Sequence, residues 1–213
     1  MARSYFDSVR YIIKKLVKDI INVCLFGAWL PTAGTAAPIT IRTCFIQKIL
    51  GFNRSAYWPT HHSSVISNPS NILIGIGTAP GLSSGCYIQG IGKIHIGDYT
   101  IIAPNVGIIS ANHDIYDYRK HIKGSVKIGR YCWIGMNAVI MPDVELGDHT
   151  VVSAGAVVTE SFPKGYCVIA GNPAKCIKKI IKEDCVEYKN EYEYYGYIKK
   201  NKFASFRAKH LDV

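Results

Sequence analysis

The stretch VKIGRYCWIGMNAVIMPDVELGDHTVVSAGAVVTESFP, residues 126–163, repeats with a period of six residues. The first position of every hexad in this part of the chain is aliphatic, and the residue after it is frequently small. These aliphatic positions are Ile122, Ile128, Ile134, Ile140, Leu146, Val152 and Val158. A helix repeats near 3.6 residues and a strand at two, so a period of six indicates a solenoid of short strands and corners.

The same period runs through the preceding residues with less regularity. Its first positions are Ile66, Ile72, Thr78, Ser84, Gly90, Ile96, Ile102 and Ile108. Three hexads close one triangular coil of about 18 residues, which stacks Ile72 over Gly90 over Ile108, and Ile128 over Leu146. A β-sandwich would need alternating polarity and turn signals every 8–12 residues or so, and the sequence has neither. We therefore predict a mainly β protein, a parallel β-helix of about five coils.

The chain divides into three predicted parts. Residues 1–65 form an N-terminal helical segment, residues 66–163 the β-helix with an external loop at 114–121, and residues 164–213 a C-terminal turn and helical tail. Within the first part, residues 5–25 place apolar positions at helical spacing opposite Arg10 and three lysines. This helix is expected either to cap one end of the β-helix or to lie on an anionic membrane as a peripheral contact.

The net charge of +10 is concentrated at the two ends of the sequence. Residues 1–65 carry +6, residues 66–163 carry −1 and residues 164–213 carry +5. A nearly neutral repeat region offers no basic groove for a phosphate backbone, so a nucleic-acid partner is not expected.

The seven cysteines are scattered and include no C-x-x-C pair. This pattern predicts neither a disulfide framework nor a zinc ribbon. The apolar N-terminal stretch is interrupted by Lys14, Lys15, Lys18 and Asp19, which is not typical of a cleavable signal peptide. The expected location is the cytoplasm, including the inner face of the membrane.

Residues 114–121, with the sequence DIYDYRKH, interrupt the six-residue period. An insertion in a solenoid has to loop outward, and such loops commonly form the walls of binding sites. The tyrosines, arginine and aspartates of this loop suit a polar ligand, and Tyr116 is a candidate substrate contact.

The repeats resemble those of the hexapeptide-repeat acyltransferases. The resemblance also rests on KIHIGDYTIIAPNVGIISANHD (93–114) and on the closing VIAGNPAKCIKKI (168–180). PGLSSGCYIQGIG (80–92) points to the branch that O-acetylates sugars and polysaccharides. The resemblance implies a left-handed β-helix, acetyl-CoA as co-substrate, no metal, and a homotrimer with active sites between subunits.

In that family the catalytic histidine precedes the protruding loop, a place that His113 occupies here. Imidazole has a pKa of about 6.5, so it can accept the proton of an alcohol and return it to a leaving thiolate. We expect Asn112 to face inward or brace the turn and Asp114 to orient the imidazole; both are also candidate substrate contacts.

The resemblance places acetyl-CoA beside Trp133 and along the backbone at Ala154, Gly155 and Thr159. Lys175 and Lys178 follow the GNPAK turn and are expected at its phosphates. Many relatives have a lysine where this chain has Glu160, which removes one phosphate contact.

For the acceptor, Tyr87 and Gln89 are expected beneath the loop, where aromatic and amide groups suit a sugar. His95 precedes His113 by 18 residues, so it should stack one coil away on the same edge and either line the site or face solvent. Ile91 replaces the acceptor-binding aspartate of the galactoside enzymes.

These expectations favour an acetyl-CoA-dependent acetyltransferase that acts on a sugar hydroxyl in capsular or O-antigen polysaccharide synthesis. An amino-sugar N-acetyltransferase is the nearest alternative. A metal-dependent β-helix hydratase would need convergent histidines, and only His95 and His113 are expected to share an edge. A non-catalytic β-helix binder is the remaining alternative.

Overall fold

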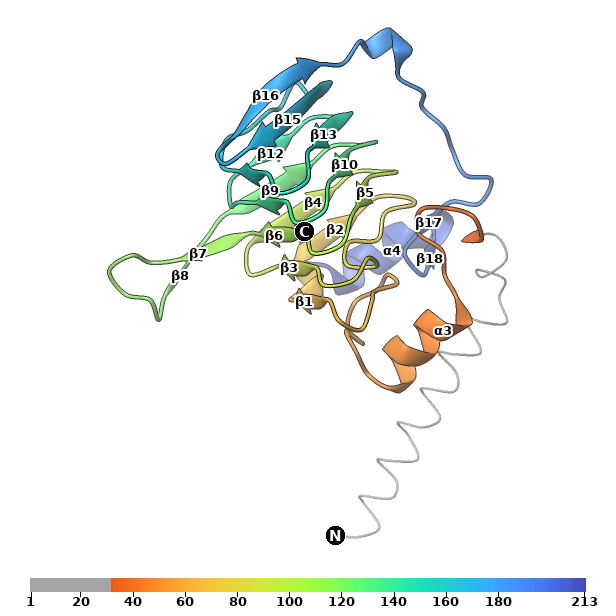
Figure 1. The fold of residues 1–213 in the computed structure, drawn as a ribbon. Coiled ribbons are helices and arrows are strands. Elements are labelled where there is room, and N and C mark those ends of the chain that lie inside the picture. Colours follow the sequence, from red (N-terminus) through yellow and green to blue (C-terminus); the bar gives the residue numbers. More distant parts are fainter. Residues whose placement is uncertain (1–31) are drawn as a thin grey trace, which may run out of the picture.

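Three parallel sheets wind into a triangular coil in the computed structural model, which describes residues 32–213 (Figure 1). Sheet A contains β1 (Val65–Ser67), β3 (Tyr87–Gln89), β6 (Gly107–Ile109), β11 (Val139–Ile140) and β14 (Val157–Val158). Sheet B contains β2 (Ile72–Ile74), β4 (Lys93–Ile96), β9 (Ser125–Ile128) and β12 (Glu145–Leu146). Sheet C contains β5 (Ile101–Ile102), β10 (Trp133–Ile134), β13 (Thr150–Val152), β15 (Cys167–Gly171) and the antiparallel β16 (Ala174–Lys179).

The later coils follow the six-residue period. Val139 pairs with Val157, and Ile128 pairs with Leu146, each 18 positions further along. The predicted stacking of Ile128 over Leu146 is therefore confirmed. Gly129 shows why small residues recur at the corners, because a Cβ built there would lie 2.5 Å from the Asp148 nitrogen.

The earlier coils are longer than predicted. Ile72 pairs with Ile94 and not with Gly90, and Ile108 pairs with Ile88. The predicted column of Ile72, Gly90 and Ile108 was wrong, because the glycine-rich turns between β2 and β3 add residues to the first coil. Its strands are consequently 22 positions from their partners, as in the pairing of Ile72 with Ile94.

Branched aliphatic side chains fill the interior of the coil. Side chains at equivalent inward-pointing positions of successive coils stack in columns. Fully buried members include Ile72, Ile74, Ile88, Ile94, Ile108, Ile134, Ile140, Leu146 and Ile169. Removing one such side chain to alanine typically costs about 2–5 kcal/mol, so these columns hold the coils in register.

An aromatic ladder runs along the corner between sheets B and C. Tyr99, Tyr131, His149 and Tyr166 stack with ring centroids 5.0–5.2 Å apart, close to the spacing of adjacent strands. All four residues have positive φ, between 48° and 57°. Bulky residues seldom adopt this conformation, and stacking along the ladder helps to offset its cost.

The C-terminal residues return along this ladder to the first coil (Figure 1). Beyond β16 and η3 (Lys182–Asp184), the Tyr131 hydroxyl donates to the Tyr188 carbonyl at 2.7 Å, and the Asn190 nitrogen donates to the Tyr99 hydroxyl at 3.2 Å. The chain then forms the hairpin of β17 (Tyr194–Tyr195) and β18 (Ile198–Lys199), followed by α4 (Lys200–His210). The predicted helical tail is thus an extended arm that ends in one α-helix.

The first coil is covered by aromatic residues. Trp58 is fully buried and its indole nitrogen donates to the Pro80 carbonyl at 2.7 Å. The Tyr57 ring lies against Trp58 and against Phe203 and Phe206 of α4. These residues cap the coil, while the helix predicted over residues 5–25 lies outside the described residues.

The remaining helical elements are short. They are α3 (Ile41–Cys44), which continues directly into the π-helix η1 (Phe45–Ile49), and η2 (Pro69–Asn71). Within residues 32–213, no helix combines the length and the apolar character needed to cross a bilayer.

Candidate active site

A β-hairpin projects from the corner between sheets A and B (Figure 1). Its strands are β7 (Ala111–His113) and β8 (His121–Lys123), and it replaces the simple loop predicted at 114–121. The hairpin lengthens its coil, because Ile94 pairs with Val126, 32 positions later. The insertion into an 18-residue coil is therefore 14 residues and not eight.

The imidazole of His113 lies near the tip of this hairpin. Its Nδ1 is 2.5 Å from the Tyr118 carbonyl oxygen. A carbonyl can only accept a hydrogen bond, so in the neutral imidazole Nδ1 carries the proton and Nε2 has the lone pair. Tautomer and ring orientation are thus suited to a general base that acts through Nε2.

Asp114 does not orient the imidazole, so that expectation was wrong. Its carboxylate accepts hydrogen bonds from the Tyr116 and Asp117 nitrogens at 2.7 and 3.1 Å. This is the local turn geometry that aspartate favours, and it shapes the hairpin tip. The expectation that Asn112 faces inward was also wrong, because its side chain is exposed on β7.

The tip of the hairpin presents aromatic side chains to solvent. Tyr116 is 93% exposed and Tyr118 is 75% exposed. Both stand on a two-stranded ribbon that has no other strand beside it within the described residues. The position suits a wall for a ligand, which is the role predicted for Tyr116.

Gln89 supports the hairpin and does not face a ligand. Its side chain is buried, and its Oε1 accepts a hydrogen bond from the Ala111 nitrogen at 3.0 Å. The prediction that Gln89 contacts the acceptor was therefore wrong, because its side chain anchors β7 instead. Tyr87, two residues earlier on sheet A, is 43% exposed and remains available to a ligand.

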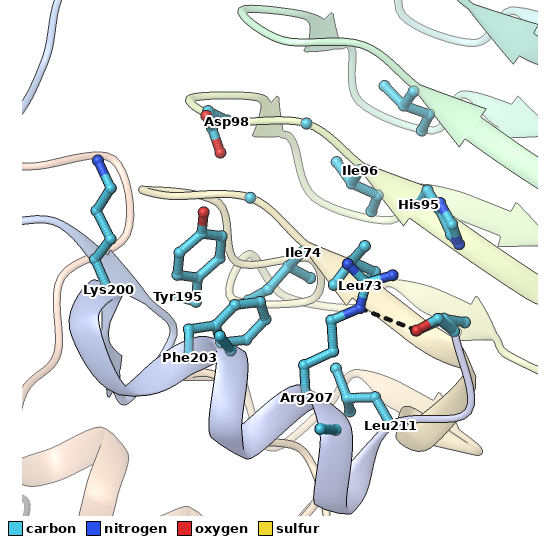
Figure 2. A pocket seen from close by; sticks show the side chains of 16 residues that line it. Leu73, Ile74, His95, Ile96, Asp98, Tyr195, Lys200, Phe203, Arg207 and Leu211 are labelled. Carbon is cyan, nitrogen blue, oxygen red and sulfur yellow. Dashed lines mark hydrogen bonds between the residues drawn. The ribbon is translucent and has the colours of Figure 1, made fainter.

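His95 does not share an edge with His113, so the predicted stacking was wrong. It pairs with Leu73 and Lys127 on sheet B, since the 14-residue insertion puts Lys127 where an uninterrupted period would have put His113. His95 lines a groove of about 720 Å³ between sheet B and α4 (Figure 2). Burial lowers the pKa of His95, and the nearby charges of Arg207, Lys127 and Lys93 lower it further.

The residues expected to bind acetyl-CoA begin on sheet C. Trp133 in β10 is 55% exposed, between Ile101 and Val151 of the adjacent strands. Ala154 and Gly155 form the next corner, where a Cβ at Gly155 would meet no atom within 4 Å. Thr159 is exposed just after β14. An exposed ring beside an open, small-residue corner fits a long, thin thioester arm.

The basic residues expected at its phosphates differ in their surroundings. The Lys175 ammonium is 2.6 Å from the Glu160 carboxylate, in an exposed ion pair. Lys178 is exposed on β16 and has no ion pair with the described residues. Glu160, the departure from the family pattern, thus neutralises one of the two predicted phosphate ligands.

The predicted residues fall into two groups on one chain. The hairpin with His113 leaves the corner between sheets A and B, whereas Trp133 lies on sheet C, the third side of the coil. Tyr87, Gln89 and the hairpin lie together around sheet A, and His95 lies with neither group. One copy of the chain does not bring His113 and Trp133 together.

His121 is a neighbour of His113 on the hairpin that is not among the predicted site residues. The two residues are cross-strand partners, and their rings are 4.3 Å apart. Pairing the residues on either side of the loop as a hairpin would have identified it. Across the described residues, no group of three His, Cys, Asp or Glu side chains is arranged to hold a metal ion.

Comparison with known proteins finds the same repeat. Residues 125–160 match the family model described as bacterial transferase hexapeptide (six repeats). The galactoside O-acetyltransferase of Escherichia coli (strain K12) is 36% identical over 104 residues, which is 47% of this chain and 51% of that protein. The chain spans about half the length of the curated relatives it matches.

Two solved structures share the fold. A maltose O-acetyltransferase from Clostridium difficile 630 is 28% identical, with a TM-score of 0.51 over 78% of this chain and 89% of that one. A galactoside acetyltransferase in complex with coenzyme A is 29% identical, with a TM-score of 0.53 over 66% and 70%. The expected left-handed parallel β-helix is thereby confirmed. Residues 125–160 are thus similar to the bacterial transferase hexapeptide repeat, and the coil as a whole has the fold of these solved sugar O-acetyltransferases.

Proposed function

We propose that this chain transfers an acetyl group from acetyl-CoA to a sugar hydroxyl. The observation that carries the proposal is the hydrogen bond from Nδ1 of His113 to the Tyr118 carbonyl, which leaves Nε2 free as a base. The similarity to galactoside and maltose O-acetyltransferases supports the reaction class. We further propose a role in capsular or O-antigen polysaccharide synthesis, on the motif at residues 80–92, in the cytoplasm at the inner face of the membrane.

In this mechanism the base is held ready by the hairpin. Acetyl-CoA supplies the acetyl group as a thioester. Nε2 of His113 takes the proton from the sugar hydroxyl as its oxygen attacks the acetyl carbon, and the same nitrogen returns that proton to the departing sulfur. The Tyr118 carbonyl accepts from Nδ1 throughout, so it stabilises the imidazolium that forms between the two transfers.

The remaining site residues divide between the acetyl-CoA side, which begins on sheet C, and the acceptor side, around sheet A and the hairpin. Trp133, Ala154, Gly155 and Thr159 would hold the acyl and pantetheine end, and Lys178 with Lys175 the phosphate end. Lys175 has to exchange its carboxylate partner for a phosphate, so Lys178 is the more readily available of the two. Tyr87, Tyr116 and Asn112 would line the acceptor side.

A homotrimer with shared sites is part of the proposal. It is supported by the separation of His113 and Trp133 onto different sides of one coil. In a ring of copies, the hairpin of one can lie against sheet C of the next, because a head-to-tail interface joins two different surfaces.

The test combines acceptor screening with one variant. We expect release of free thiol from acetyl-CoA with saccharides that offer hydroxyl groups, and a loss of about 10²- to 10⁴-fold in His113→Ala with coenzyme A binding retained. His210→Ala, an exposed histidine on α4, is the matched control and should be unchanged.

Other outcomes would replace the proposal. Turnover with amino sugars alone would identify an N-acetyltransferase. Stoichiometric zinc in elemental analysis would favour a hydratase. No thermal shift with acetyl-CoA would leave a non-catalytic binder, and near-normal turnover in His113→Ala would exclude His113 as the base.

A further inference from the structure

The helix formed by α3 and η1 turns its apolar side toward solvent. Ile41, Phe45, Leu50 and Phe52, on this helix and just beyond it, are 51%, 51%, 57% and 49% exposed. The opposite side, packed against the protein, contains the buried residues of the helix, which include the polar Gln47. A helix on a soluble protein usually turns its large apolar side chains inward, whereas Ile41 and Phe45 of this helix face outward.

Hydrogen bonds keep the helix in this orientation. The Gln47 amide nitrogen donates to the carbonyls of Asn53, Ala56 and Trp58 at 3.1, 3.2 and 2.9 Å. Its oxygen accepts from the Tyr197 hydroxyl at 2.6 Å. Rotation of the helix to bury its apolar side would leave this buried amide unsatisfied, which is costly. The exposed apolar side is therefore built into the fold.

The sequence that contains this side carries charges of a single sign. No aspartate or glutamate occurs between Asp19 and Asp98, whereas Arg42, Lys48 and Arg54 lie on or next to the helix. A stretch of 78 residues without an acidic group is unusual in a chain that contains 15 of them. Half-exposed apolar side chains among cations match the surface of a bilayer that contains anionic lipids.

We propose that the 41–52 face, defined as Ile41, Phe45, Leu50 and Phe52 with Arg42, docks on an anionic lipid bilayer. The sequence leading to it supports this occupant, because residues 5–25 carry a basic and apolar pattern of the same kind. The inference is independent of the acetyltransferase proposal, since membrane binding can be measured without turnover.

A bilayer fits this face better than a second copy does. Stable interfaces between proteins bury about 800 Å² on each partner, which four half-exposed side chains do not provide. Docking on a membrane needs only a few apolar side chains inserted at the headgroup boundary together with attraction to anionic lipids.

Vesicle co-sedimentation of the full chain tests the proposal. We expect binding to vesicles of equal parts phosphatidylcholine and phosphatidylglycerol, and much weaker binding to phosphatidylcholine alone. Phe45→Ser with Leu50→Ser should weaken binding by about tenfold or more, because two inserted side chains are lost. The control is Ile177→Ser with Val186→Ser, two positions at least as exposed, beyond the last coil, which should bind like the parent.

A pair of charge variants at one site separates attraction from misfolding. Ile41→Glu and Ile41→Lys lose the same apolar contact, but only the glutamate is repelled by anionic lipid, so Ile41→Lys should bind more tightly by about fivefold or more. Equal binding of the pair, or parental binding of the serine double variant, would overturn the proposal. So would a double variant that changes only the oligomeric state or the melting temperature, because the face would then be covered by protein.

Discussion

Tyr118 holds the His113 imidazole through its main-chain carbonyl, so no change to the Tyr118 side chain deletes that hydrogen bond directly. The sequence predicted the histidine from its place before the loop, but it assigned the orienting role to Asp114. A sequence can suggest a carboxylate as the partner of a histidine, because only some residues carry one. It cannot single out a backbone carbonyl, because every residue has one. Only the path of the hairpin shows which carbonyl reaches Nδ1.

The lowered pKa of His95 predicts that the free energy of unfolding depends on pH. Its pKa is lowered from 6.5 in the folded protein, so the unfolded chain binds a proton more readily there. The contribution of the neutral imidazole is complete above about pH 6.5 and is lost as the pH falls through the lowered folded pKa. His95→Gln should therefore lose less stability than the parent between about pH 7 and pH 5.

Urea unfolding at several pH values measures this difference. His210→Gln, at an exposed position on α4, should follow the parent. Parallel curves for His95→Gln and the parent would show that His95 is not the group responsible.

Among the elements, the later strands were the most predictable from sequence. From Ile128 onward an unbroken aliphatic position recurs every six residues, and the observed register follows it. Before Ile96 the glycine-rich turns lengthen the first coil, and a fixed period then places Gly90 where Ile94 belongs. The length of these turns depends on the backbone geometry of a few glycines, and the repeat of aliphatic side chains carries no information about that geometry.

The structure of the hairpin predicts that a substitution of Asp114 lowers the catalytic rate more than it lowers the stability. Asp114→Ala removes the acceptor for two backbone nitrogens at the tip. An isolated two-stranded ribbon is only marginally stable, so its tip should loosen and His113 should lose its alignment. We expect kcat to fall by about tenfold, since misplacement near the chemistry is costly, with the melting temperature unchanged.

Steady-state kinetics and thermal melting of the same preparation check this expectation. Lys120→Ala, which removes only an exposed ion pair with Asp117 on the same hairpin, should retain its activity. A fall in melting temperature without a change in kcat would show that Asp114 stabilises the coil instead.

At the scale of the whole molecule, the two groups of site residues belong to different faces, and complementation tests whether copies share a site. His113→Ala and Trp133→Ala should each be nearly inactive alone. In mixed trimers some sites combine an intact hairpin with an intact sheet C, so co-expression should restore about a quarter of the parent activity. Activity no greater than that of the separate variants would place each site within one copy.

The overall arrangement was predictable only in part. The hexads predicted the coil and its core, since the columns that they form are what the fold buries. The tail was expected to be helical, yet its Tyr188 and Asn190 bond to the aromatic ladder, an arrangement that depends on rings from two coils. Contacts across such sequence distances have no local signal.

That tail has a consequence for how the molecule comes apart. A solenoid ordinarily frays one repeat at a time, because each coil contacts only its neighbours. Here the chain leaves the last coil at β16, fastens to the ladder beside Tyr131 and Tyr99, and ends in α4 against the cap of the first coil. The C-terminal arm thereby links the last coil to the first, so we expect the two ends to unfold together in a single cooperative event.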